Sequence, residues 1–124
     1  MGKTGIIIVS HVHEIAKGAH RLIEEVAADV DVQVIGGVDQ TEVGTSFDTA
    51  LETINNSSAE NLLAFYDLGS AKMNLEMAIE MSDKNIKIYD VPVVEGSYTA
   101  AALLQAEVGQ ESIDEQLKEM HIVK

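Results

Sequence analysis

Gly5-Ile-Ile-Ile-Val9, followed at once by Ser10-His11, is the stretch that decides the fold. A β-branched run without polar alternation is typical of a strand that is buried on both faces of a parallel sheet. After His13, apolar residues recur at helical spacing while charged residues occupy the other side. The apolar stripe is Ile15, Ala19, Leu22 and Val26. The sequence therefore predicts a strand, a turn that contains a histidine, and a helix.

Strands and helices continue to alternate along the chain. Further strands are predicted at Asp31–Ile35, Leu62–Tyr66 and Ile86–Tyr89, with an extra edge strand at Ile122–Val123. The helix that opens at Gly44-Thr45-Ser46 has the stripe Phe47, Leu51 and Ile54, and the helix after Ser70 has the stripe Leu75, Ala78 and Ile79. A fourth helix is predicted over Ser97–Glu107 with a stop at Gly109, and a fifth from the capping box Ser112–Glu115.

This alternation predicts an α/β fold, because strands that alternate with helices form right-handed βαβ units. We expect three layers, with helices on both faces of a mostly parallel central sheet, in a single domain over residues 1–124. In the common small doubly wound arrangement, the strand order is 2-1-3-4, and a crevice opens between the carboxyl ends of the first and third strands. Ligands bind in that crevice, so the residues that follow these two strands are the first candidates for a site.

Ser10-His11 follows the first strand, and Asp67-Leu-Gly-Ser70 follows the third. A carboxylate that accepts the proton of one imidazole nitrogen fixes the tautomer and leaves the other nitrogen free to attack. We therefore interpret His11 as a nucleophile that Asp67 orients. Phosphoryl transfer also needs donors for the phosphate oxygens, which helix N-termini and hydroxyl groups supply. The candidate phosphate-binding residues are Thr45, Ser46, Gly69 and Ser70.

The composition excludes several classes of protein. The 124 residues include 21 Asp and Glu against 8 Lys and Arg, a formal charge of −13 that repels nucleic acid and anionic membrane surfaces. The absence of cysteine excludes a disulfide framework and thiolate metal sites. Apolar runs are far shorter than the roughly 20 residues of a membrane span. We therefore expect a cytoplasmic protein without nucleic-acid or membrane partners.

Other motifs are similar to metal sites or to a phosphoacceptor aspartate, but they support those functions less than they support a histidine nucleophile. His11-Val-His13 is similar to the paired metal ligands of metal-dependent hydrolase barrels, but the chain is too short for that barrel. Asp67 is similar to the phosphoacceptor of response-regulator receivers, but Val9-Ser-His11 replaces the acidic pair that holds magnesium there. We expect neither a metal nor a cofactor on this chain. Met73, Met77 and Met81 recur every four residues, which favours core packing over a protein interface.

The motifs Ile6–His11, Gly44-Thr-Ser46 and Asp67–Ala71 resemble the phosphotransferase subunit of phosphoenolpyruvate-dependent dihydroxyacetone kinase. That family is similar to the mannose-type EIIA domains of the bacterial sugar phosphotransferase system. The resemblance covers nearly the whole chain and implies a cytoplasmic phosphotransferase component of glycerol metabolism. Asp67 matches the carboxylate that pairs with the active histidine of the relatives, Ser70 falls near their phosphate-contacting serine, and Thr45 is a looser match.

The resemblance also implies the partners of the chain. The carrier HPr would phosphorylate His11, which would pass the group to ADP in the nucleotide subunit of the kinase, so that ADP, ATP and magnesium lie on that partner. It implies a homodimer, for which the apolar segment Val91–Leu104 is the expected interface. Two alternatives stay open. One is the EIIA component of a mannose-family sugar transporter, and the other is a noncatalytic, flavodoxin-like binding or signalling module.

Overall fold

Four parallel strands form the sheet in the computed structural model, which describes residues 3–124. They are β1 (Thr4–Ser10), β2 (Val32–Gly36), β3 (Asn61–Tyr66) and β4 (Asn85–Ile88). Their order is β2-β1-β3-β4, which confirms the predicted order. The apolar run of β1 lies at the centre because both of its edges are paired, and Ile6, Ile7 and Ile8 are completely buried.

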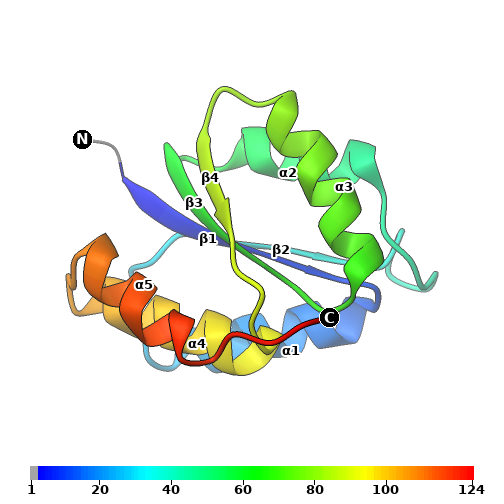
Figure 1. The fold of residues 1–124 in the computed structure, drawn as a ribbon. Helices are drawn as coiled ribbons and strands as arrows, with labels where there is room; N and C mark the ends of the chain where they lie inside the picture. The colour runs from blue at the N-terminus through cyan, green and yellow to red at the C-terminus, as the bar shows by residue number, and fades with distance from the viewer. Residues whose placement is uncertain (1–2) are drawn as a thin grey trace.

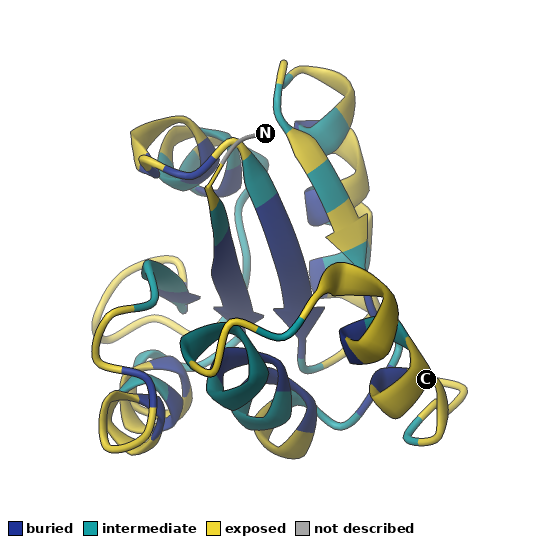
Figure 2. Ribbon diagram, turned by 90° about the vertical axis from the view of Figure 1, so that its left-hand side faces the viewer, coloured by how far each residue is buried: buried dark blue, intermediate teal, exposed yellow. Residues whose placement is uncertain are grey.

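Helices cover both faces of this sheet, so the fold has the three layers expected (Figure 1). One layer contains α1 (His13–Glu24), α4 (Val93–Gln105) and α5 (Gln110–Lys118). The other contains α2 (Phe47–Asn56) and α3 (Gly69–Glu80). Figure 2 shows the buried central strands between helices whose outer sides are exposed.

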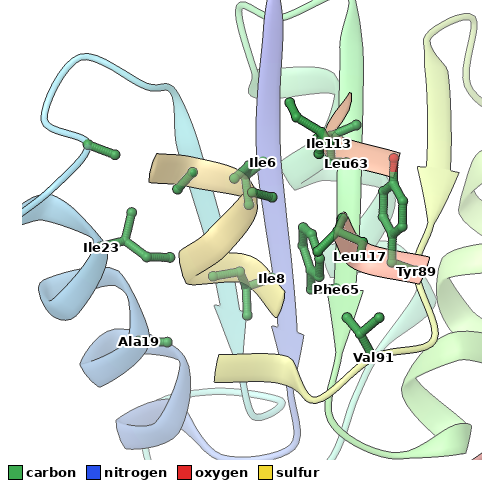
Figure 3. Close-up of a cluster of buried hydrophobic side chains, with 13 residues drawn as sticks. Ile6, Ile8, Ala19, Ile23, Leu63, Phe65, Tyr89, Val91, Ile113 and Leu117 are labelled. Atoms are coloured by element: carbon green, nitrogen blue, oxygen red, sulfur yellow. The ribbon is translucent and has the colours of Figure 1, made fainter. Parts of the chain in front are cut away.

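Two hydrophobic clusters hold the layers together, and β1 contributes to both because successive side chains of a strand point to opposite faces. Ile6 and Ile8 pack with residues of α1, α4 and α5 (Figure 3), whereas Ile7 and Val9 pack with residues of α2 and α3. In α2, Ile54 is completely buried and Phe47 and Leu51 pack beside it, which confirms the predicted stripe.

The predicted inner face of α1 is largely wrong. The helix buries Ala16, Ala19 and Ile23 and leaves Ile15 and Leu22 exposed at 45% and 47%, while Val26 lies beyond its end and is 37% exposed. The reason is close packing on the end of β2. A Cβ atom on Gly36 would lie only 2.5 Å from the Cα atom of His13 and 2.9 Å from the Cβ atom of Ala16. Small side chains fit at that distance, so α1 turns its alanines toward the sheet.

The later helices begin earlier than predicted. α4 begins at Val93, directly after Pro92, because proline fits at the start of a helix, where its missing N–H is not needed. α5 begins at Gln110 with Gly109 as its N-cap, so Ser112 lies inside the helix and forms no capping box. Gly109 therefore opens α5 rather than stopping α4, whose last turn leads into Glu107 with a positive φ of 61°.

The predicted edge strand at Ile122–Val123 is also absent from the described sheet. The backbone N–H of Ile122 donates one hydrogen bond to the carbonyl of Asp90, which lies beyond the end of β4. A single bond there does not make a ladder with β4. Within residues 3–124, no helix has the length and hydropathy that crossing a membrane requires.

The three methionines of α3 lie on its outer side rather than in the core. Met73, Met77 and Met81 are 64%, 51% and 67% exposed. The buried face of α3 consists of Ala71, Leu75 and Ala78, while Ile79 is only half-buried. Core packing is therefore the wrong interpretation of the methionine spacing.

Candidate functional site

His11 and Asp67 meet at the carboxyl ends of β1 and β3. Val9 and Tyr66 are paired across the two strands, and the N–H of Asp67 donates to the carbonyl of Val9 at 3.1 Å. The residues that follow β1 and β3 therefore leave the sheet side by side. Nδ1 of His11 lies 2.8 Å from Oδ1 of Asp67, and 16% and 13% of the two side chains are exposed. The structure thus brings the two candidates together at the predicted crevice.

The Asp67 carboxylate accepts more hydrogen bonds than the one from the imidazole. Oδ2 accepts from the hydroxyl of Ser10 and from the backbone N–H of His11, both at 2.9 Å, and Oδ1 accepts from the N–H of Leu68 at 2.7 Å. Burial by itself raises the pKa of Asp67, but the bonds from His11, Ser10 and Leu68 together outweigh it and hold the pKa below its ordinary value of 3.8. Asp67 is therefore an anion that is fixed on both oxygens.

This anion decides the tautomer of His11. Because an ionised carboxylate only accepts, Nδ1 carries the proton and donates to Asp67, and Nε2 keeps its lone pair. The hydroxyl of Ser70 lies 2.6 Å from Nε2 and donates to it. Ser70 is the second residue of α3, so Nε2 faces the N-terminus of that helix. The arrangement presents a nucleophilic nitrogen beside a hydroxyl group and the positive end of a helix dipole.

Thr45 and Ser46 have different roles, and only Thr45 contacts α3. The N–H of Gly44 donates to the carbonyl of His11 at 2.8 Å, which ties this loop to the histidine turn. Oγ1 of Thr45 accepts from the amide of Asn74 at 2.7 Å, so Thr45 is held against α3 one turn beyond Ser70. Oγ of Ser46 accepts from the N–H of Thr49 at 3.3 Å and caps α2.

Sequence reasoning missed two residues of this network. Ser10 is completely buried and hydrogen-bonds Asp67, and its signal in the sequence is a polar residue at the end of an apolar strand. Asn74 positions Thr45, and its signal is an asparagine inside a helix, where this residue type is unfavourable without a partner. The other histidines lie outside the network. His20 faces Glu24 at 3.8 Å, and the residues described contain no group of three His, Asp or Glu side chains placed to hold a metal.

A second polar cluster lies beside the end of β3. The hydroxyl of Tyr66 donates to Asp90, and Lys72 forms an ion pair with the same carboxylate at 2.9 Å. These two contacts hold the pKa of Asp90 below its ordinary value. Nζ of Lys124 lies 3.9 Å from the centre of the Tyr66 ring, which places one more positive charge near Asp67. The acidic site is thus bordered by lysines on the β4 side.

The sequence matches one protein family and several of its named members. Residues 5–114 match the family model EIIA-man, described as the PTS system fructose IIA component. The chain is 52% identical over 120 residues to the PTS-dependent dihydroxyacetone kinase, phosphotransferase subunit DhaM, of Lactococcus lactis, covering 97% of this chain and 98% of that protein. It is 43% identical to PEP-dependent dihydroxyacetone kinase 1, phosphoryl donor subunit DhaM, of Listeria innocua, covering 95% of each.

The fold is similar to a solved structure as well. The crystal structure of a protein of unknown function matches with a TM-score of 0.82 at 27% sequence identity, over 98% of this chain and 95% of the other. The three-layer arrangement is therefore shared along nearly the full length of both chains.

Proposed function

The chain belongs to the EIIA-man family, and from this premise we propose that it is the phosphoryl donor subunit of a phosphoenolpyruvate-dependent dihydroxyacetone kinase, with His11 as the phosphorylated residue. The observation that supports this most directly is the 2.8 Å contact of Nδ1 with Asp67, which leaves the lone pair of the nucleophile on Nε2. The named relatives in Lactococcus lactis and Listeria innocua support the kinase branch of the family.

In the first step, HPr donates its phosphoryl group to His11. The lone pair of Nε2 attacks phosphorus, the bond between phosphorus and the HPr side chain breaks, and the electron pair of that bond leaves with HPr. The Nδ1 proton stays on the ring and remains hydrogen-bonded to Asp67, whose negative charge stabilises the positive charge that develops on the imidazole. The Ser70 hydroxyl, which donates to Nε2 beforehand, turns to donate to a phosphoryl oxygen.

In the second step, the phosphoryl group leaves for ADP that is bound to the nucleotide subunit of the kinase. An oxygen of the ADP terminal phosphate attacks phosphorus, the bond from Nε2 breaks, and His11 regains the lone pair. The ATP that forms then phosphorylates dihydroxyacetone on the partner subunits. Magnesium and the nucleotide belong to the partner, so this chain contributes only the oriented imidazole and donors at Ser70, Gly69 and Thr45.

We also propose a homodimer through the layer of α1 and α4. A groove of about 380 Å³ on this layer is lined by Leu22, Val94, Tyr98 and Met120 together with Glu95 and Thr99, and Leu22 and Val94 are 47% and 38% exposed. Of the segment expected to form the interface, Val94 and Tyr98 reach the groove, whereas Ala100 and Ala101 are buried in the core. An apolar groove at the meeting of two helices is suited to a second copy of the same chain.

Intact-mass measurement at alkaline pH tests the relay. Wild type and His11→Ala are incubated with phosphoenolpyruvate, enzyme I and HPr, and one added phosphate is expected on wild type only. Discharge by the ADP-loaded kinase subunit supports the dihydroxyacetone branch. Discharge only by the EIIB component of a sugar transporter would support the second candidate, which the fructose IIA description of the family model favours. No added phosphate on wild type would refute the carrier function and leave a noncatalytic binding module.

A further inference from the structure

An exposed apolar stripe on α3 begins at the phosphoryl site. Ser70, Met73, Met77 and Met81 are spaced at i, i+3, i+7 and i+11, which places them on one side of the helix. The three methionines are 64%, 51% and 67% exposed, and Leu68, just before the helix, is 59% exposed. At 1.5 Å per residue, the stripe extends about 16 Å from Ser70 to Met81.

The core does not explain this stripe, because α3 packs on the sheet through Ala71, Leu75 and Ala78. Methionine is flexible and polarisable, so it packs well against partners of varied shape. Contiguous exposed apolar residues on a soluble protein mark interaction surfaces. One end of the stripe lies at the reacting atom, since the Ser70 hydroxyl is 2.6 Å from Nε2 of His11. A protein that brings a phosphoryl group to Nε2 therefore has to lie over the first turn of α3.

The charges around the stripe indicate what kind of protein fits. Glu76 and Glu80 are exposed and lie beside the methionines on α3, Lys72 on the same helix is paired with Asp90, and the whole chain has a formal charge of −13. A partner with an apolar patch bordered by lysine and arginine side chains would match both properties. A second copy of this chain has the same carboxylates, and the proposed dimer places it on the α1 and α4 layer instead.

We propose that Leu68, Met73 and Met77 form the docking surface for the phosphoryl-carrying partner, a protein with an apolar patch and a cationic border. The inference rests on the proposed function, because a partner is expected over α3 only if it delivers a phosphoryl group to Nε2 of His11. The donor has to reach that atom, so it covers the first turns of α3 during transfer.

Two double variants that differ only in polarity test the docking surface. Met73→Gln with Met77→Gln keeps the side-chain length and the charge but removes the apolar contact, whereas Met73→Leu with Met77→Leu keeps the contact. Phosphorylation of His11 is followed by intact mass at increasing concentrations of phosphorylated HPr. The glutamine pair is expected to raise KM about tenfold with kcat within about twofold of wild type, and the leucine pair to keep both within about twofold.

A small phosphoryl donor separates docking from chemistry. Phosphoramidate is a small molecule that reacts with His11 without a docking surface. It is therefore expected to phosphorylate wild type and the glutamine pair at equal rates. If the glutamine pair keeps the wild-type KM for phosphorylated HPr, the docking surface is refuted while the carrier function stands. If light scattering shows that the glutamine pair loses a dimer, the stripe is covered by a second copy and the proposal is overturned. If neither donor phosphorylates wild type, the proposed function itself fails.

Discussion

At the scale of single residues, Asp67 organises the site. It fixes the imidazole of His11 through Nδ1, and it is itself fixed by the Ser10 hydroxyl and two backbone N–H groups. In the proposed transfer, a carboxylate held on both oxygens does not rotate away when the ring becomes charged, so it keeps Nε2 oriented for attack.

Asp67→Asn is expected to slow phosphoryl transfer to His11 by about 10²- to 10⁴-fold. The amide keeps the size of the side chain, but its NH₂ group faces N–H donors and its single acceptor oxygen no longer fixes the tautomer. The rate is measured by intact mass with phosphorylated HPr. Asp83→Asn, an exposed residue beyond α3, serves as the matched control and should transfer at the wild-type rate. A wild-type rate in Asp67→Asn would show that the orienting bond is dispensable.

The lowered pKa of Asp67 also predicts how stability depends on pH. Because the pKa is below 3.8 in the folded chain, the contacts of the carboxylate stabilise the fold fully above that value. This contribution is lost as the pH falls through the folded-state pKa. The difference in urea unfolding free energy between wild type and Asp67→Asn should therefore have its full value near pH 5 and should narrow below about pH 4. A difference that stays constant down to about pH 2 would contradict the assignment.

At the scale of elements, α1 shows how packing chooses between two helical stripes. Ala16, Ala19 and Ile23 face the sheet, while Ile15 and Leu22, one position before Ala16 and Ile23, stay outside. Gly36 at the end of β2 allows this close approach, which also sets where the histidine turn leaves β1.

Paired truncations on α1 distinguish its two faces. Ile23→Ala removes a side chain that is 1% exposed and should lower the free energy of unfolding by about 2–5 kcal/mol. Ile15→Ala removes a side chain that is 45% exposed and lies outside the proposed dimer groove, and it should change this free energy by at most about 0.5 kcal/mol. Urea unfolding of both variants measures the difference. Equal losses would mean that the helix is rotated from the orientation described.

At the scale of the whole molecule, two apolar surfaces lie on opposite layers. The groove of Leu22, Val94 and Tyr98 belongs to the α1 and α4 layer, and the methionine stripe belongs to α3 on the other face of the sheet (Figure 1). A dimer through the first surface leaves His11 and the second surface accessible to other proteins. The proposed dimer contact and the proposed transfer site therefore lie on different layers of the molecule.

Charges placed in the α1 and α4 groove are expected to dissociate the dimer. Leu22→Glu with Tyr98→Glu puts two like charges from each copy into an apolar contact, so the mass from light scattering should fall to that of the 13.4 kDa chain. Phosphorylation of His11 should stay within about twofold of wild type, because neither residue touches the site. If the variant with both glutamates keeps the mass of a dimer, the groove is not the dimer interface.

The sequence by itself determined the α/β alternation, the order of the strands and the juxtaposition of His11 with Asp67. These follow from local patterns, since buried parallel strands read as continuous apolar runs and the topology of such sheets has few solutions. Residues that end neighbouring strands then meet at one edge, whatever the details of packing.

Only the tertiary structure decided which stripe of α1 is buried, that Ser10 and Asn74 support the site, and that the methionines of α3 face outward. Several stripes of α1 and α3 satisfy helical periodicity, and the distance to neighbouring elements selects among them. Likewise, the bond from Asn74 to Thr45 joins residues 29 positions apart, so it exists only once α2 and α3 lie side by side. Periodicity specifies that a helix has a face, but the packing of other elements specifies which face it is.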